Sequence, residues 1–312
     1  MNILLTGSSG LIGTALVDRL SGDGHRATRL VRGAPVRDAP ARGGRTVDVS
    51  WDPDRGAVDV TGLERAGPFD GVVHLAGAGI GDKRWSADRK AIILESRIES
   101  TRLLVDALGR LSTPPPVLVS ASAVGWYGDR GDEMLTEAST PGTGFLAEVC
   151  QAWEAAAEPA AQSGIRTVHL RTGVVISGTG GALGKQLPLF RLGLGGRMGT
   201  GQQYRSWIAL EDEVNVILRG LGDAGLSGPV NATAPHPVTD GELARSLGAA
   251  LNRPSVVAVP AFALRLALGR EMADELVLGG QRVLPAALQS VGYEFAHAHL
   301  DGAVRAALTP AV

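Results

Sequence analysis

The sequence predicts an α/β fold in which a doubly wound parallel sheet is followed by a smaller C-terminal substrate domain. Three observations support this. A short apolar run at residues 3–5 leads through a glycine turn into an amphipathic stretch at 14–20. Strand-like and helix-like segments then alternate, as parallel strands with crossover helices require. After Arg171 the composition changes to glycine-rich stretches and short helical segments. The first half therefore reads as a Rossmann-type domain.

The glycine turn Thr6-Gly-Ser-Ser-Gly-Leu-Ile-Gly13 is the most informative motif. In such a unit Gly7 permits the tight turn, Gly10 lets the backbone approach a pyrophosphate, and Gly13 lets helix pack on strand. The free amides and positive dipole end of the following helix attract phosphates. A structural turn is the alternative, because the chain holds 43 glycines. The position between strand and helix favours a dinucleotide ligand.

The remaining elements of the first half follow in order. We expect strands at 26–31, 71–76, 117–119 and 166–170, and helices at 86–111 and 145–161. Ligands bind such sheets outside the carboxyl ends of the strands. The glycine turn and the ends of these strands should therefore line one crevice.

The second half begins with two glycine-rich stretches, at 177–181 and 193–201, which we interpret as loops over the cleft. A phosphate-cradling role is the alternative, but neither stretch has the lysine-serine ending of a P-loop. Short helical segments are expected at 212–221, 240–251, 261–268 and 285–291. We predict an NADP-binding domain over 1–173 and a mainly substrate-side domain over 174–312, with a segment near 206–234 returning to the first domain.

Cofactor choice depends on the end of the second strand. An NAD enzyme usually places an acid there, whereas this chain reads Leu30-Val-Arg32-Gly33 and has no acid until Asp38. The guanidinium of Arg32 would pair with a 2′-phosphate, which indicates NADP. A solvated surface arginine is the alternative, and Arg29 is the second candidate for this role.

Composition excludes several classes of function. A net charge of −2 without a basic cluster argues against nucleic acid, and the absence of a long apolar run argues against a membrane. The first strand occupies the N-terminus, so we expect a cytoplasmic protein without a leader. The single cysteine, Cys150, forms no internal disulfide, indicates no metal site and is expected to pack in a helix. The subunit count stays open, with a homodimer as one option.

Several motifs together carry a resemblance to a known group. They include Leu75-Ala-Gly77, Ser96 to Thr101, Ser120 to Gly128, Trp153 to Ala156, Phe190 to Gly196, Ser206 to Ile208 and Gly280 to Pro285. The chain resembles the atypical extended short-chain dehydrogenase/reductases, the nucleoside-diphosphate-sugar epimerase-like "epimerase family" proteins, over essentially its whole length. The resemblance implies NADP binding and leaves the substrate open. Ala209 departs from the histidine expected after Ser206-Trp-Ile208.

Ordinary short-chain dehydrogenases use a Tyr-x-x-x-Lys pair, because the ammonium one helical turn away stabilises the phenolate. Gly131, Ile208 and His297 stand four residues after the three tyrosines, so this chain has no such pair. In the helix where the tyrosine and lysine of this pair are expected, Phe145 and Val149 lie near their positions. The substitutes we expect are Ser122, at a strand end, and Tyr127, in the following loop, as catalytic residues.

Other residues are assigned to ligands. The expected NADP-binding residues are Gly7, Ser8, Ser9, Gly10, Leu11, Ile12, Gly13, Arg32, His74, Leu75, Ala76, Gly77, Ser96, Ser120, Arg171, Gly173 and Val174. Lys185, Arg205 and Trp207 are expected to hold an unidentified small-molecule substrate. Two functions remain open: an NADP(H)-dependent oxidoreductase or epimerase-like enzyme, and a non-catalytic sensor of NADP(H).

Overall fold

The computed structural model describes residues 1–33 and 46–309 and is built around one large sheet. Its eight strands run in the order β12-β8-β6-β5-β1-β2-β3-β4. Their bounds are β1 (Asn2–Thr6), β2 (Arg26–Arg32), β3 (Thr46–Asp52), β4 (Ala57–Val58), β5 (Gly71–His74), β6 (Val117–Ala123), β8 (Arg166–Thr172) and β12 (Gly228–Ala232). All neighbouring pairs are parallel except β3 and β4. The predicted doubly wound α/β fold is confirmed.

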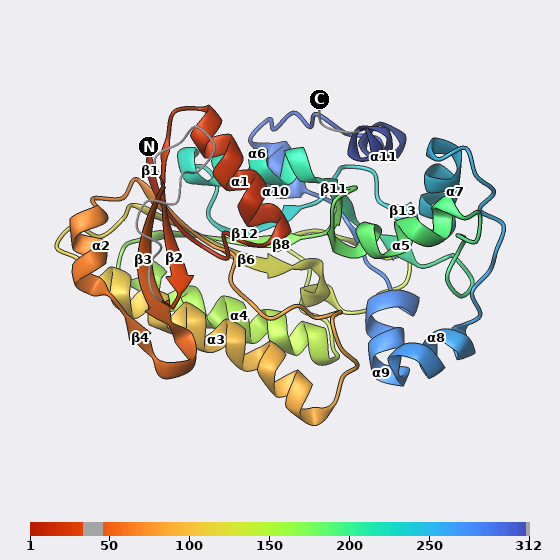
Figure 1. The fold of residues 1–312 in the computed structure, drawn as a ribbon, viewed down its shortest axis with the longest axis horizontal. Helices are drawn as coiled ribbons and strands as arrows, with labels where there is room; N and C mark the ends of the chain where they lie inside the picture. Colours follow the sequence, from red (N-terminus) through yellow and green to blue (C-terminus); the bar gives the residue numbers. More distant parts are fainter. Residues whose placement is uncertain (34–45, 310–312) are drawn as a thin grey trace.

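Helices cover both faces of this sheet (Figure 1). One face carries α1 (Leu11–Gly22), α6 (Leu210–Gly222) and α10 (Ala286–Ser290), and the other carries α2 (Val60–Ala66), α3 (Ala87–Gly109) and α4 (Phe145–Gln162). Successive strand residues alternate between the two cores, so that Val72 packs with α3 and Val73 packs with α1 and α6. The short helices η1 (Pro53–Arg55) and η2 (Val124–Tyr127) follow β3 and β6. We call this part the first lobe.

The second lobe has its own core around Phe190, Trp207, Leu247 and Val304. Its elements are β9 (Val174–Ile176), α5 (Gly181–Arg191), β10 (Tyr204–Arg205), β11 (Trp207–Ala209), β13 (Val238–Thr239), α7 (Asp240–Ala250), α8 (Ala261–Leu268), α9 (Arg270–Ala273), the π-helical turn η3 (Asp274–Leu278) and α11 (Leu300–Leu308). Strand β7 (Met134–Leu135) pairs with β14 (Arg282–Val283), joining the second half of the chain to the first. The domain division at residue 173 stays a prediction.

The two glycine-rich stretches differ in their surroundings. A Cβ on Gly180 or Gly181 would lie 3.4 or 3.2 Å from the side chain of Leu11, so the first stretch lies against the start of α1. In the second stretch, a Cβ on Gly196 would lie 1.7 Å from the carbonyl oxygen of Val257. Gly196 therefore allows close backbone packing within the second lobe, and the position of this stretch over the cleft stays a prediction.

Candidate functional site

The glycine turn joins β1 to α1 by very close backbone contacts. Gly7 adopts φ +70°, and a Cβ there would lie 2.6 Å from the carbonyl group of Leu75. A Cβ on Gly13 would lie 2.2 Å from the carbonyl oxygen of Gly7. No side chain fits at either position, so the turn holds the start of α1 directly over the ends of β1 and β5.

The N-terminus of α1 is open to a ligand. Gly10 is the N-cap and supplies no capping side chain, and Ser9 and Gly10 are both exposed. The first amide with an intrahelical partner is that of Thr14, which donates to Gly10 at 2.9 Å. The amides of residues 11–13, between Gly10 and Thr14, donate to no acceptor within the described part of the chain. Three free amides at a positive helix end form an anion site, which fits the diphosphate predicted from the sequence.

Arg32 lies at the carboxyl end of β2, beside this anion site. Its side chain is 62% exposed, and the one ion pair that it forms with a described residue, to Asp54 at 3.2 Å, is also exposed. Such a pair is weak, so the guanidinium is available to another anion. Arg29, in contrast, donates two hydrogen bonds to the carboxylate of Asp48, at 2.7 and 2.9 Å, which leaves Arg32 as the candidate for a 2′-phosphate. Asp38 lies outside the described residues.

Buried polar side chains form hydrogen bonds at the carboxyl end of β5. His74 is fully buried between the hydroxyls of Thr6 (2.8 Å) and Thr101 (2.9 Å). Burial, with Arg97 as a second cause, lowers the pKa of His74 to about 3, so it is neutral and braces the strand rather than contacting a ligand. Ser96 accepts a hydrogen bond from the amide of Ala78 at 3.1 Å and so fixes the loop after Leu75, Ala76 and Gly77.

A residue that sequence reasoning did not single out lies under this loop. The guanidinium of Arg97 donates to the carbonyl of Ala78 and stacks over Trp153 at 4.8 Å. A Cβ on Gly77 would lie 3.1 Å from that guanidinium. A larger residue at position 77 would therefore press on Arg97. In the sequence, nothing local connects Gly77 with Arg97, which lies within the Ser96 to Thr101 motif.

A hydrogen-bonded network occupies the ends of β6 and β8. The hydroxyl of Ser122 donates to Glu154 Oε1 at 2.6 Å. The same carboxylate receives two hydrogen bonds from Arg171, both at 2.8 Å. Arg171 is 3% exposed and lies 3.5 Å from the ring of Trp126. Its guanidinium holds Glu154 and is not exposed to a cofactor, which corrects the expectation that Arg171 contacts NADP.

Tyr127 belongs to the same network and does not reach the cleft. It is 0% exposed, and its hydroxyl donates to Asn231 at 2.7 Å and accepts from Arg171 at 3.1 Å. Burial raises the pKa of the phenol, against the smaller opposing effect of Arg171. The expected role of Tyr127 as a cleft proton donor is therefore wrong for this structure, because both hydrogen-bonding functions of the hydroxyl are used inside the core.

Three further expectations concern Ser120, Gly173 and Val174. Ser120 is fully buried, and its hydroxyl has no partner in the described part of the chain. A Cβ on Gly173 would lie 2.6 Å from the carbonyl oxygen of Ser206, and that same oxygen accepts from the amide of Val174 at 2.7 Å. Gly173 thus allows β8 to continue into β9 against β11.

The expected substrate residues divide into two kinds. Lys185 is exposed and contacts the carbonyl of Gly81 at 3.0 Å and Asp82 at 3.1 Å, so it stays a candidate. Arg205 is buried in an ion pair with Asp240 at 3.1 Å. Trp207 is 0% exposed and donates its indole N–H to the carbonyl of His236. Arg205 and Trp207 hold the second lobe together, which corrects their expected contact with a substrate.

The position on α4 where the Tyr-x-x-x-Lys pair of ordinary short-chain dehydrogenases is expected is apolar. Phe145 (7% exposed) and Val149 (2%) pack in one cluster with Ile93, and Trp85 meets the ring of Phe145 edge-on at 4.9 Å. Cys150, on the same helix, is buried, and burial raises the pKa of its thiol to about 12, as a packing role requires. No side chain of this cluster transfers a proton.

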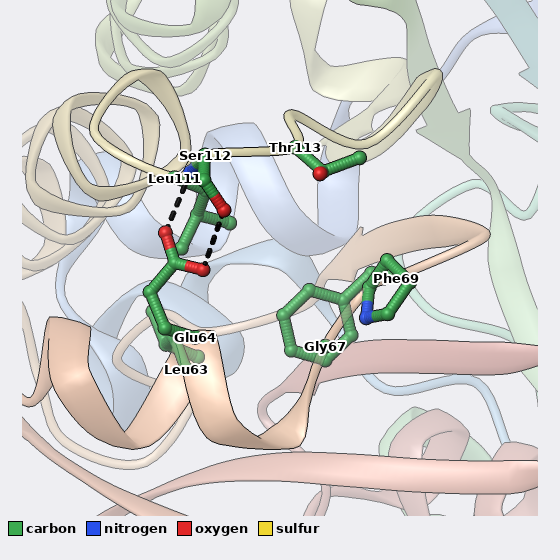
Figure 2. Close-up of a pocket in the computed structure, with 8 residues that line it drawn as sticks. Leu63, Glu64, Gly67, Phe69, Leu111, Ser112 and Thr113 are labelled. Atoms are coloured by element: carbon green, nitrogen blue, oxygen red, sulfur yellow. Dashed lines mark hydrogen bonds between the residues drawn. The ribbon is translucent and has the colours of Figure 1, made fainter.

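Two cavities lie away from the crevice. One of about 130 Å³ is at the amino ends of β5 and β6, where the carboxylate of Glu64 accepts from the amide and hydroxyl of Ser112 (Figure 2). The other, of about 380 Å³, lies beside the first residues of β2 and β3. No group of acidic, histidine or cysteine side chains suited to a metal occurs in residues 1–33 and 46–309. Within the same residues no helix is long and apolar enough to cross a membrane.

The sheet order, the glycine turn and the strand-end network define an extended short-chain dehydrogenase/reductase. A model of the NAD dependent epimerase/dehydratase family matches residues 3–231, and a domain of unknown function (DUF1731) matches residues 259–307. The chain belongs to the NAD dependent epimerase/dehydratase family.

Relatives align along nearly the whole chain. Epimerase family protein Mb2239 of Mycobacterium bovis is 43% identical over 98% of this chain and 97% of its own length. The crystal structure of human epimerase family protein SDR39U1 (isoform 2) with NADPH has a TM-score of 0.86 and 31% identity, covering 98% of both chains. A nucleoside-diphosphate sugar epimerase from Corynebacterium glutamicum has a TM-score of 0.75 and 36% identity, covering 97% of this chain and 57% of that one.

Proposed function

We propose that this chain binds NADP(H) and transfers hydride between that cofactor and a small carbonyl-bearing or sugar-nucleotide-like substrate. The observation that supports NADP(H) as the cofactor is the open N-terminus of α1 beside the exposed guanidinium of Arg32. The crystallisation of human SDR39U1 with NADPH, at 31% identity over the full length, supports the same choice. The amides of residues 11–13 would hold the diphosphate, and Arg32 would pair with the 2′-phosphate.

The nicotinamide, when bound, supplies or accepts the hydride. The proton then requires a route through the chain, because the ordinary tyrosine and lysine are replaced by the apolar cluster of Phe145 and Val149. Ser122 donates its only hydroxyl proton to Glu154. Ser122 is 4% exposed, and its oxygen can therefore act only as an acceptor toward a further partner. A substrate hydroxyl would pass its proton to Ser122 Oγ while the serine proton moves to Glu154 Oε1, and the reverse transfer would serve carbonyl reduction.

A sensor that binds NADP(H) without turnover is the second candidate. Two observations favour it: the apolar cluster around Phe145 and the complete burial of Tyr127. In this function the Ser122–Glu154–Arg171 network is a structural brace. The two candidates share the cofactor site and differ only in whether the network moves a proton.

Replacing Arg32 with alanine tests the cofactor. We expect Arg32→Ala to weaken NADPH binding on the order of 10- to 100-fold, the range for one lost hydrogen bond to a charged group, and to leave NADH binding unchanged. Arg102→Ala is the matched control, because that side chain is 61% exposed and forms a similar exposed ion pair with Glu99 at 3.0 Å. Isothermal calorimetry measures both affinities. Equal losses for NADPH and NADH would remove the 2′-phosphate role.

Measuring NADPH consumption distinguishes the enzyme from the non-catalytic sensor. We expect the protein to consume NADPH with at least one member of a panel of carbonyls and sugar nucleotides, and Ser122→Ala and Glu154→Gln to lower kcat by about 100-fold or more. Ser112→Ala is the control, since it removes another serine–glutamate hydrogen bond, at the opposite end of the sheet (Figure 2). NADPH binding with no consumption across the panel would favour the sensor.

A further inference from the structure

Helix α8 is apolar and yet unburied. Seven of its eight residues are alanine, leucine or phenylalanine, Arg265 is its one charged residue, and none of the eight is buried. Phe262 and Leu266 are 72% and 77% exposed. They stand four residues apart and so share one face of the helix. A soluble domain normally turns such a face to its core, so this helix presents an unpartnered apolar surface.

Two neighbouring segments add to this surface. Leu189, Leu192 and Leu194, at the end of α5 and just after it, are 53%, 72% and 56% exposed, and Val256 and Val257 are 85% and 38% exposed. The two segments are packed together, because a Cβ on Gly193 would lie 3.5 Å from Pro254 and the amide of Val259 donates to the carbonyl of Arg197.

Helix α8 follows directly after Pro260, at the same end of the molecule as α5 (Figure 1). We call these residues the apolar end: Leu189, Leu192, Leu194, Val256, Val257, Phe262 and Leu266. They make up seven of the ten large hydrophobic side chains that are exposed in the described part of the chain. The exposed large hydrophobic side chains are thus concentrated at one end of the molecule.

Cations outnumber acids around the apolar end, where Asp274 pairs with Arg265 of α8 and Asp82 pairs with Lys185 of α5. No aspartate or glutamate occurs from residue 159 to 210 or from 243 to 270, although the whole chain has a net charge of −2. Arg191, Arg197 and Arg253 are exposed and form no ion pair with any described residue. The surface therefore combines projecting apolar side chains with unneutralised cations.

We propose that the apolar end binds peripherally to an anionic lipid surface. Leucine, valine and phenylalanine side chains enter the interface between headgroups and acyl chains, while the surrounding arginines pair with anionic headgroups. A second copy of the chain fits less well. A two-fold interface through this surface would bring Arg191, Arg197 and Arg253 of both copies together, while the acids at this end, Asp274 and Asp82, already pair with Arg265 and Lys185. This proposal departs from the sequence-based expectation of no membrane partner, which rests on the absence of a long apolar run, because peripheral binding needs no such run.

Vesicle flotation with the full chain tests this proposal. We expect binding to vesicles of 30% phosphatidylserine in phosphatidylcholine, little binding to phosphatidylcholine alone, and release at 0.5 M salt. The double variant Phe262→Ser/Leu266→Ser should lower the partition coefficient more than 10-fold, since two apolar contacts with the lipid are lost. Arg191→Gln/Arg253→Gln should lower it as well, and only for anionic vesicles.

Ile92→Ser/Met134→Ser is the matched control, because these side chains are 50% and 61% exposed and lie on the first lobe. All variants change exposed positions, and far-UV circular dichroism checks their folding. The proposal is overturned if anionic vesicles do not bind, if the control variant loses binding equally, or if sedimentation shows a dimer that the Phe262/Leu266 variant abolishes. The outcome does not depend on NADPH binding or turnover.

Discussion

Glu213 is an ionisable group buried without a charged partner among the described residues. It lies in the first turn of α6, is 0% exposed, and accepts one hydrogen bond, from Thr172 at 2.8 Å. Its second oxygen has no partner in the part of the chain that the structure describes. Burial raises the pKa of this carboxyl from 4.5 to about 8, against a smaller opposing effect of Thr172. The protonated acid is therefore the form that the fold accepts near neutral pH.

This burial makes stability depend on pH. Between about pH 4.5 and pH 8 the folded state keeps a proton that the unfolded state releases, so the free energy of unfolding falls as pH rises through this window. Glutamine removes the ionisation and keeps the acceptor oxygen. We expect Glu213→Gln to raise Tm by a few degrees at pH 8 and by much less at pH 5, as measured by differential scanning calorimetry. Glu211→Gln, on the same helix and 61% exposed, is the control; an equal change at both pH values would contradict the assignment.

At this scale the sequence predicts backbone roles better than side-chain roles. The steric roles of Gly7 and Gly13 are correctly predicted, because a tight turn between strand and helix brings backbone close at these positions whatever side chains surround it, as the contacts of Gly7 with Leu75 and of Gly13 with Gly7 show. Arg205 and Tyr127 are wrongly assigned because their direction depends on Asp240 and Asn231, which are 35 and 104 residues away. A polar residue after a strand looks the same in the sequence whether it faces a ligand or a buried partner.

Among the elements, α4 depends on a cap from the other half of the chain. Its N-cap is Gly144, with φ +106° and no side chain to accept the free amides. The carboxylate of Glu275, in the π-helical turn η3, accepts from the amides of Phe145 at 2.9 Å and Leu146 at 2.8 Å. An anion at a helix N-terminus is also favoured by the helix dipole. Glu275 therefore fixes the end of α4 that carries the apolar cluster.

Removing this cap should destabilise the protein. We expect Glu275→Ala to lower the free energy of unfolding by about 1–3 kcal/mol, because two charge-assisted hydrogen bonds and a favourable dipole contact are lost. Urea denaturation measures the change. Glu99→Ala, which removes an exposed carboxylate from α3, should change stability by less than about 0.5 kcal/mol. Equal losses in the two variants would contradict a capping role for Glu275.

Element prediction succeeds where periodicity is long. The helices predicted at 86–111 and 145–161 are α3 (Ala87–Gly109) and α4 (Phe145–Gln162). Strand β3, helix α2 and helix α11 were not predicted. The seven residues of β3 alternate polar and apolar side chains over a short span beside glycine-rich sequence, and α2 has only seven residues. Short segments gain their structure from packing on the sheet rather than from their own pattern.

At the scale of the whole molecule, the chain crosses between the lobes several times. Leu288 of α10 is buried in the core of the first lobe, although most of the preceding 50 residues belong to the second. The hydroxyl of Ser206 donates to the carbonyl of Gln281 and accepts from the amide of Val283, and Asn231 donates to the carbonyl of Leu284. The sequence predicts one returning segment, near 206–234, but not the return at 282–288, because those contacts are long-range and leave no local pattern.

These crossings should make unfolding a single cooperative event. We expect urea unfolding curves from far-UV and near-UV circular dichroism to coincide, since the segment that supplies Leu288 to the core of the first lobe also supplies the Gly279 carbonyl that Arg205 of the second lobe binds. Near-UV signals report on both lobes, because Trp51 lies in the first core and Trp207 in the second. Two separated midpoints would show that the lobes are independent domains.

The apolar cluster that replaces the usual tyrosine and lysine has a practical consequence. Trp85 is held there by its indole hydrogen bond to Ile80 at 2.9 Å and by its edge-on contact with Phe145, and Lys90 lies 4.5 Å from the same phenyl ring. An indole emits with an intensity that follows its surroundings, so a molecule settling beside this cluster would alter the intrinsic fluorescence. The protein thus carries a label-free optical reporter at the place where most members of its class carry out proton chemistry.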